Sequence, residues 1–412
     1  MEPEADVVQE LVDTLPLLIS LEYLGLGGVE NLLELHTALT PAFCTLSTLR
    51  RIDFTGANNK ACPLLVGLHA PLISASIDFR ASDGQMLWDH LDVDEWERYH
   101  PTTLLNNFSS TLEELECVSW YTTPDNAVMP TQVYPNMQKL SIQLHQFPLC
   151  IEAFIRAFPN LTDLHVGAED HRGDVETIHE SHTANVAQQQ ALNSCGTWAH
   201  LEHFYGCLVD LHAIGLTSPI QRLTLDDRLD EGPQTEMLAT MLRYARPSHL
   251  KVDAIAGTFL GDNTQGFISM LRDESASNLM NLDICIYFGK DDREKDLSAV
   301  IDNLVSALTS LPLKFLELEF VTSDLNPTPP EPTLTPAELS LQSLNMDALV
   351  ARLESMQSLQ AAHVLLRSSH HGGDSDWKGY ERTITKGTEC LAGWEQWESW
   401  VFGKNGLVLS QS

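Results

Sequence analysis

A hydrophobic phrase of the form Leu-x-x-Leu-x-Leu recurs along the chain, and it constrains the fold more than any other feature. It is clearest at residues 21–26, 49–54, 161–166, 279–284 and 313–318, and weaker copies lie at residues 72–77, 112–117, 137–142, 201–206, 220–225, 247–252 and 359–364. Recurrence at intervals of about 20 to 45 residues is typical of stacked repeat proteins. The sequence therefore predicts a solenoid, an architecture that does not by itself indicate a reaction.

Each repeat is expected to pair a short strand with a helix. The phrase alternates apolar and polar residues, as a half-buried strand does, and the segments before it have the helical period. One apolar stripe runs from Leu297 to Leu311 and stops at Pro312, just before the strand phrase. A capping box at residues 335–338 predicts a further helix that carries the apolar side chains from Leu341 to Met356. Helical crossovers make consecutive strands parallel.

These features predict an α/β fold, namely an irregular leucine-rich-repeat-like solenoid (horseshoe) with parallel strands on the concave face and helices on the convex face. The solenoid is expected over residues 1–366, with a Pro-rich inserted loop at 323–336. Residues 367–412 are expected to form a C-terminal loop and an aromatic capping segment with Trp394, Trp397 and Trp400.

The repeats depart from the regular pattern in spacing and in one residue type. Successive phrases start between 19 residues (201 to 220) and 46 residues (313 to 359) apart. Regular repeats carry Asn or Cys eight residues after the first Leu, where the side chain satisfies backbone groups. Here those positions hold residues such as Val29, Glu169 and Tyr287, so the asparagine ladder is missing.

Charge and composition exclude several classes of function. Lys and Arg number 24 against 57 Asp and Glu, a formal net charge of -33 that repels phosphate backbones, so nucleic acid is not expected as a partner. No apolar stretch reaches the roughly 20 residues that a membrane span needs. The acidic first residues do not resemble a secretory signal, and the eight cysteines form no CxxC pair. We therefore expect a cytoplasmic or nuclear protein with reduced thiols.

Two turn motifs suggest a family. Phe158-Pro159-Asn160-Leu161 and Tyr134-Pro135-Asn136-Met137, with repeats of variable length and an acidic balance, make residues 15–364 resemble the leucine-rich-repeat region of fungal F-box-like proteins. The resemblance implies a substrate receptor of a ubiquitin ligase, in which an N-terminal F-box docks on a Skp-type adaptor. No F-box pattern is found in the chain, so that adaptor is expected as a partner only if an F-box lies upstream of Met1.

The predicted binding surface is the row of side chains at the fifth position of each phrase, because these point away from the core. Such a row suits a basic or mixed-charge protein segment, and neither a catalytic residue nor a cofactor is predicted. The candidate residues are Asp53, Glu116, Ser141, His165, Tyr205, Thr224, Lys251, Asp283, Glu317 and His363, with Gly25 and Ser76 in the same row.

A histidine cluster and a proline-rich segment are two further candidate sites. His165, His171, His179 and His182 are dense enough to raise the question of a metal, but their spacing is wrong for a helical zinc site, so no metal is predicted. Residues 326–336 hold five prolines and two PxxP matches, which fit either a ligand for SH3-like modules or an extended loop.

Two alternatives to a ligase receptor stay open. One is a stand-alone leucine-rich-repeat scaffold with no ligase link. The other is a polysaccharide-acting solenoid enzyme with paired carboxylates, although such β-helices lack long helical crossovers. The chain contains no phosphate-binding GxxxxGK[ST] loop, no GxSxG and no HExxH, so the interpretation is non-enzymatic.

Overall fold

The computed structural model describes residues 5–80, 87, 96–119, 131–145, 150–168, 175–191, 198–199, 201–229, 232–256, 260, 266–322, 325, 335–367 and 380–386. The chain forms two compact units, Met1–Ile220 and Gln221–Ser412, and one solenoid over residues 1–366 stays a prediction. Within the described ranges, no helix combines the length and apolarity that crossing a membrane requires.

The first unit contains a parallel sheet in which each strand pairs with the next one along the chain. Its strands are β1 (Tyr23–Leu26), β2 (Arg51–Phe54), β3 (Ser74–Asp78), β4 (Glu114–Val118), β5 (Lys139–His145), β6 (Asp163–Ala168) and β7 (His203–Gly206). Each begins two residues after the first apolar position of a phrase, because that position packs in the turn before the strand. The expected strand positions are therefore confirmed in this unit.

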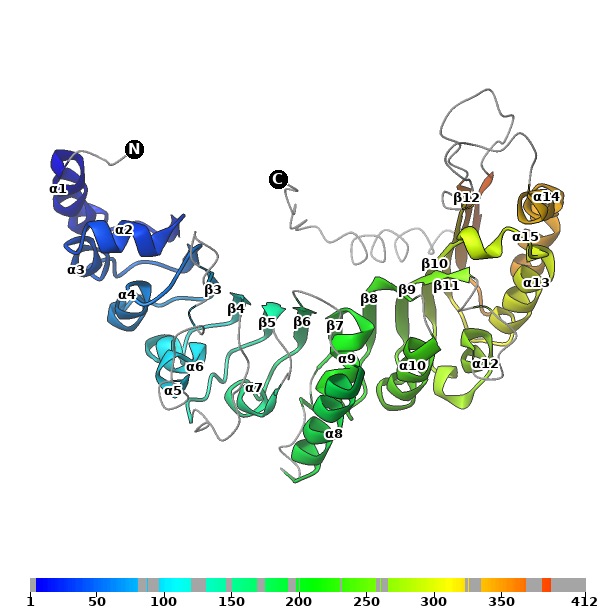
Figure 1. The fold of residues 1–412 in the computed structure, drawn as a ribbon, viewed down its shortest axis with the longest axis horizontal. Coiled ribbons are helices and arrows are strands. Elements are labelled where there is room, and N and C mark those ends of the chain that lie inside the picture. The colour runs from blue at the N-terminus through cyan, green and yellow to red at the C-terminus, as the bar shows by residue number, and fades with distance from the viewer. Residues whose placement is uncertain are drawn as a thin grey trace. The chain divides into compact units, whose positions relative to one another are not determined.

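Helices lie along one face of these strands (Figure 1). They are α1 (Ala5–Thr14), α2 (Val29–Leu35), α3 (Leu39–Phe43), α4 (Ala61–Gly67), α5 (Trp96–Tyr99), α6 (Pro101–Leu104), α7 (Glu152–Ala157), α8 (Val175–Ala191) and α9 (Leu208–Ile214), with the 3₁₀ turns η1 (Leu15–Leu17) and η4 (Asn106–Phe108). Apolar strand residues in register, such as Leu115, Leu140 and Leu164, are buried on the helix side and form the core.

The second unit repeats the design with longer strands, β8 (Arg222–Leu229), β9 (His249–Ile255), β10 (Asn281–Tyr287), β11 (Phe315–Val321), β12 (Ala361–Arg367) and β13 (Tyr380–Thr385). Strands β8 to β12 are parallel, as expected. Strand β13 pairs antiparallel with β12, and the repeat pattern does not predict it. Its single buried apolar residue, Ile384, gives almost no sequence signal.

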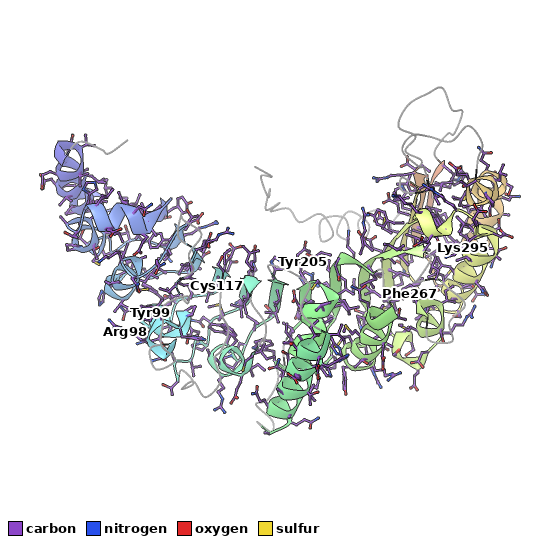
Figure 2. All side chains as sticks on the ribbon, in the orientation of Figure 1. Arg98, Tyr99, Cys117, Tyr205, Phe267 and Lys295 are labelled. Carbon is purple, nitrogen blue, oxygen red and sulfur yellow. The ribbon has the colours of Figure 1, made fainter. Side chains whose placement is uncertain are left out.

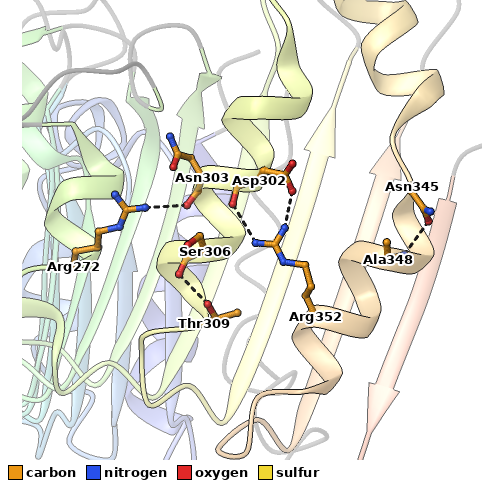
Figure 3. Close-up of polar contacts among 8 residues, drawn as sticks. All are labelled: Arg272, Asp302, Asn303, Ser306, Thr309, Asn345, Ala348 and Arg352. Atoms are coloured by element: carbon orange, nitrogen blue, oxygen red, sulfur yellow. Dashed lines mark hydrogen bonds and ion pairs between the residues drawn. The ribbon is translucent and has the colours of Figure 1, made fainter.

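The helices of the second unit are α10 (Gly232–Ala245), α12 (Phe267–Leu271), α13 (Leu297–Leu308), α14 (Pro336–Ser343) and α15 (Met346–Glu354), with η6 (Glu274–Ala276) and η7 (Lys290–Asp292). Polar contacts join neighbouring helices on their outer side (Figure 3). Arg352 of α15 donates to a carboxylate oxygen of Asp302 on α13 at 2.6 Å, and Arg272 reaches the carbonyl of Asn303 at 3.5 Å.

The capping box predicted at Thr335 is present, but the helix it opens is shorter than expected. The Thr335 amide donates to Glu338 at 2.7 Å, and the Glu338 amide donates to the Thr335 hydroxyl at 3.3 Å. The single helix expected up to Met356 is wrong, because α14 ends at Ser343. Asn345 then caps α15 by accepting from the Ala348 amide at 2.9 Å (Figure 3).

Asparagines still join successive repeats, although the expected ladder position lacks them. The two Pro-Asn turns use the amide group of the Asn to reach the preceding repeat. Asn136 donates to the carbonyl of Ser110 at 2.6 Å, and Asn160 donates to the carbonyl of Pro135 at 2.8 Å. These bonds satisfy carbonyls in the turns that lead into the strands.

Candidate functional site

The structure brings the predicted row of the first unit together. Its members occupy matching register positions on neighbouring strands, in the order Gly25, Asp53, Ser76, Glu116, Ser141, His165 and Tyr205. They alternate with buried residues and so lie on the strand face opposite the helices, where Figure 2 labels Tyr205. We call these residues, with their counterparts in the second unit, the polar row.

Hydrogen bonds run from strand to strand along this part of the polar row. Ser76 Oγ donates to Glu116 Oε2 at 3.0 Å. Gln143, two residues after Ser141 on β5, donates to Glu116 Oε1 at 2.6 Å and to Ser141 Oγ at 3.2 Å. Ser141 Oγ lies 3.1 Å from His165 Nδ1. The side chains are thereby oriented before any ligand arrives, which lowers the entropy cost of binding.

An aromatic pair ends this run of contacts. The rings of His165 and Tyr205 meet edge to face with centroids 4.6 Å apart. Burial, assisted by His203, lowers the pKa of His165 to about 4, so its imidazole is neutral at pH 7. A neutral imidazole can accept a hydrogen bond from the Ser141 hydroxyl, but its low basicity makes it a poor general base. Tyr205 is 37 % exposed and offers an apolar surface with a polar tip.

A second row of polar side chains flanks the first, at the first residue of strands β4 to β7. Lys139 pairs with Glu114 at 2.6 Å. His203 Nδ1 lies 3.5 Å from Asp163 Oδ1. The cation of Lys139 thus lies between the carboxylates of Glu114 and Asp163 on the neighbouring strands.

The second unit places Thr224, Lys251, Asp283, Glu317 and His363 in matching register. Lys251 Nζ pairs with Asp283 Oδ2 at 3.0 Å. His363 lies between two carboxylates, with Nδ1 3.7 Å from Glu317 and Nε2 3.2 Å from Glu381 on β13. A residue of the unpredicted strand β13 therefore contacts the last member of the predicted row, while the register partner of His363 on β13 is Thr383.

The carboxyl groups around Lys251 are crowded and poorly hydrated. Burial raises the pKa of Asp283, and the Lys251 ammonium opposes this rise only in part. The pKa of Glu317 is raised by burial and by the neighbouring Asp283, against the opposing effect of His363. Burial also raises the pKa of Asp253, one row along. For Lys251, burial favours the neutral form, but the charge and hydrogen bond of Asp283, together with the charges of Asp253 and Glu317, outweigh it, and the pKa lies above its ordinary value.

The next rows of the second unit add aromatic and basic groups. The guanidinium of Arg228 lies 3.8 Å from the centre of the Tyr287 ring, and the Tyr287 hydroxyl reaches Asp253 at 3.5 Å. Arg367 pairs with Glu319 at 2.8 Å, and its side chain is 66 % exposed. The strand face of this unit thus holds three carboxyl groups near one lysine, bordered by arginines.

The histidine cluster considered from the sequence has a structural role that the spacing did not reveal. His179 and His182 lie on α8 and meet His212 of α9. The rings of His182 and His212 stack with centroids 4.1 Å apart, and His212 Nε2 lies 3.2 Å from His179 Nδ1. Burial, then His182 and His179, lowers the pKa of His212 to about 3. His165 lies apart, in the polar row.

Helix α8 uses polar side chains to bind carbonyls at the C-terminal end of α9, where helices run out of intrahelical donors. His182 Nδ1 lies 2.6 Å from the carbonyl oxygen of His212 and must carry the proton. Asn185 donates to the carbonyl of Ala213 at 2.8 Å, and Gln189 donates to that of Gly215 at 3.0 Å. The spacing of 182, 185 and 189 places all three on one helix face.

The remaining sequence candidates are not supported or lie outside the described residues. In the parts of the chain that the structure covers, no group of three His, Cys, Asp or Glu side chains could hold a metal ion. His171, Glu169, the PxxP matches at 327–332, and Trp394, Trp397 and Trp400 fall among residues that the structure does not describe.

Comparison with known proteins adds no assignment. No protein-family model matches the chain, and no curated protein is similar to it in sequence.

Proposed function

We propose that the chain is a non-catalytic protein-binding module built as an irregular leucine-rich-repeat-like solenoid, whose partner lies along the polar row. The observation that supports this most is the register. Residues spread over hundreds of sequence positions occupy one row per unit, opposite the helices, and neighbouring members are linked by hydrogen bonds and ion pairs. A row of this kind can follow an extended segment of another protein.

The chemistry of the row indicates the kind of partner. In the first unit, hydroxyl, amide and aromatic groups such as Ser141, Gln143 and Tyr205 offer adaptable polar contacts around an exposed ring. In the second unit, Asp283 is buried and Glu317 is half-buried, the pKa values of both carboxyl groups are raised, and a cationic side chain from a partner would stabilise both as anions. The proposed partner is a mixed-charge segment with basic side chains facing the second unit.

A cellular setting goes with this proposal. The resemblance to the repeat region of fungal F-box-like proteins suggests a substrate receptor of a ubiquitin ligase, acting in the cytoplasm or nucleus. The described cysteines Cys44, Cys62, Cys117, Cys150, Cys207 and Cys285 form no disulfide with one another, which fits a reducing compartment. A stand-alone scaffold is the alternative, and it differs by having no Skp-type adaptor or cullin among its partners.

The test compares two exposed tyrosines on opposite sides of the repeats. Tyr205 belongs to the polar row and is 37 % exposed, while Tyr244 on helix α10 is 41 % exposed. Tagged wild type, Tyr205→Ala and Tyr244→Ala are expressed in the native cells, and bound proteins are quantified by mass spectrometry. Tyr205→Ala is expected to lose about tenfold or more of a stoichiometric partner, as a central aromatic contact would, whereas Tyr244→Ala keeps it.

Two results would count against the proposal. Equal recovery of the partner with all three proteins would show that the polar row is not part of the binding surface. Labelling of Ser141 by a fluorophosphonate probe would show a nucleophile where the low pKa of His165 argues against one. Recovery of a cullin with the partner separates the ligase receptor from the stand-alone scaffold.

A further inference from the structure

The beginning of the first unit exposes a group of aliphatic side chains. Val7 and Leu11 on helix α1 are 57 % and 38 % exposed. Leu17 and Leu18 in and after η1 are 73 % and 38 % exposed, and Ile19 is 79 % exposed. We call these five side chains the α1–η1 surface. Five exposed aliphatic residues within 13 positions form a patch rather than scattered exposure, and such patches mark interaction sites.

This surface belongs to folded structure. Helix α1 contacts both η1 and helix α3, and Leu15 between them is buried. The turn after η1 is closed by backbone hydrogen bonds from Leu18 to Leu15 at 3.1 Å and from Ile19 to Leu17 at 2.9 Å. Val7 and Leu11 are one helical turn apart and therefore share a side of α1. Val8 and Val12, on the neighbouring side of α1, are half-buried, so the helix is attached to the unit while Val7 and Leu11 stay exposed.

The sequence that forms this surface carries carboxylates and no basic side chain. Residues 1–49 contain no Lys or Arg, so all 24 basic residues of the chain lie from Arg50 onward. The same 49 residues contain eight carboxylates, at Glu2, Glu4, Asp6, Glu10, Asp13, Glu22, Glu30 and Glu34. Glu10 and Asp13 are exposed on helix α1 itself, whereas Glu22 lies next to Arg50 and Arg51, whose backbone amides donate to its carbonyl oxygen at 2.8 and 3.0 Å. Helix α1 therefore combines exposed aliphatic side chains with exposed negative charge.

We propose that the α1–η1 surface docks a basic amphipathic helix of another protein. The apolar stripe of such a helix would cover Val7, Leu11, Leu17 and Ile19, and its Lys and Arg side chains would meet Glu10 and Asp13. A second copy of this chain is the wrong occupant, since a symmetric contact would set these carboxylates against their own copies. This site lies on the helix side of the first repeat and is separate from the polar row.

The test uses a fluorescein-labelled peptide of about 14 residues made only of Leu and Lys, with Leu at helical i, i+3, i+4, i+7 spacing. Binding to the full chain is followed by fluorescence anisotropy. The variant Leu17→Ser with Ile19→Ser removes two exposed side chains without touching the core. We expect it to weaken binding about tenfold or more. The matched control, Val66→Ser with Leu339→Ser, removes similarly exposed side chains elsewhere and should bind like wild type.

A scrambled peptide of the same composition measures the charge attraction alone, and Leu17→Ser with Ile19→Ser should not change its binding. The variant Glu10→Gln with Asp13→Asn should weaken binding of the amphipathic peptide at about 50 mM salt, and this difference should vanish near 500 mM, where charges are screened. Equal binding of the amphipathic peptide by wild type and the Leu17→Ser, Ile19→Ser variant would overturn the proposal. So would salt-induced dimers that this variant disperses, since a second copy would then be the occupant.

Discussion

The contact between helices α8 and α9 predicts that acid destabilises the first unit through one histidine. His212 is 4 % exposed, its ring is stacked on His182, and its pKa is lowered to about 3. An unfolded chain would hold the same side chain at its ordinary pKa of about 6.5. The folded state therefore binds the proton less tightly, so the stability that His212 contributes is complete above pH 6.5 and is lost as the pH falls toward 3.

The magnitude follows from the shift. Between pH 7 and pH 5 the unfolded chain takes up most of a proton at this position, while the folded chain takes up almost none. At about 1.4 kcal/mol per pH unit, the first unit should lose about 2 kcal/mol through His212 alone over that interval. Burial also lowers the pKa of His100 to about 3 and that of His165 to about 4, so the wild-type slope is steeper than this single contribution.

The variant His212→Phe tests the reasoning, because it keeps a ring against His182 and removes the titrating group. Wild type should lose about 2 kcal/mol more than His212→Phe between pH 7 and pH 5. Hydrogen exchange of peptides covering α8 and α9, corrected for the intrinsic rate at each pH, reports the local opening free energy in this unit.

A second variant separates titration from the loss of the contact. Asn185→Leu removes the bond to the Ala213 carbonyl without removing a titratable group. It should lower the opening free energy of α8 by a similar amount at both pH values and keep the wild-type slope. The reasoning is refuted if His212→Phe has the same pH slope as wild type.

Two further predictions concern the second unit. The variant Thr335→Ala removes the hydroxyl that caps α14 and should lower the free energy of unfolding in urea by about 1 kcal/mol, whereas Ser343→Ala at the other end of the helix should change it far less. For the Lys251–Asp283 pair, the variants are Lys251→Met, Asp283→Asn and the double variant, each measured by urea unfolding. The losses of unfolding free energy in the two single variants should together exceed the loss in the double variant by about 1 to 2 kcal/mol, which is the coupling energy of the pair. A coupling energy near zero would mean that the ion pair does not hold the row together.

The strands could be predicted from the sequence because their signal is local. Leu115, Leu140 and Leu164 recur within a fixed phrase, and each one is buried where the phrase places it. The members of the polar row can be predicted from the same phrase, because side chains alternate along a strand and Glu116, Ser141 and His165 therefore lie on the other face. The hydrogen bonds between these side chains could not be predicted from the phrase, because Gln143 can join Glu116 to Ser141 only when the strands are paired.

The elements that the sequence did not predict share a physical cause. They are stabilised by polar groups or by contacts between residues that are far apart in the sequence. Strand β13 is held to β12 by backbone pairing and buries little beyond Ile384. Helix α8 buries Asn185 and Gln189 rather than an apolar stripe, so hydrophobic periodicity does not reveal its inner face. The break between α14 and α15 differs, because it has a local sequence signal: Asn345 is a strong helix N-cap residue.

The antiparallel strand β13 also determines how the second unit could be rebuilt. A parallel array can be lengthened by one helix and one strand wherever both neighbours run the same way, as β10 and β11 do over seven paired positions. Strand β13 runs antiparallel to β12, so another parallel module placed beside β13 would meet a neighbour with the wrong hydrogen-bonding pattern. Modules added by protein engineering should therefore be inserted between existing parallel strands. There the register of the polar row is kept, and only the number of its members changes.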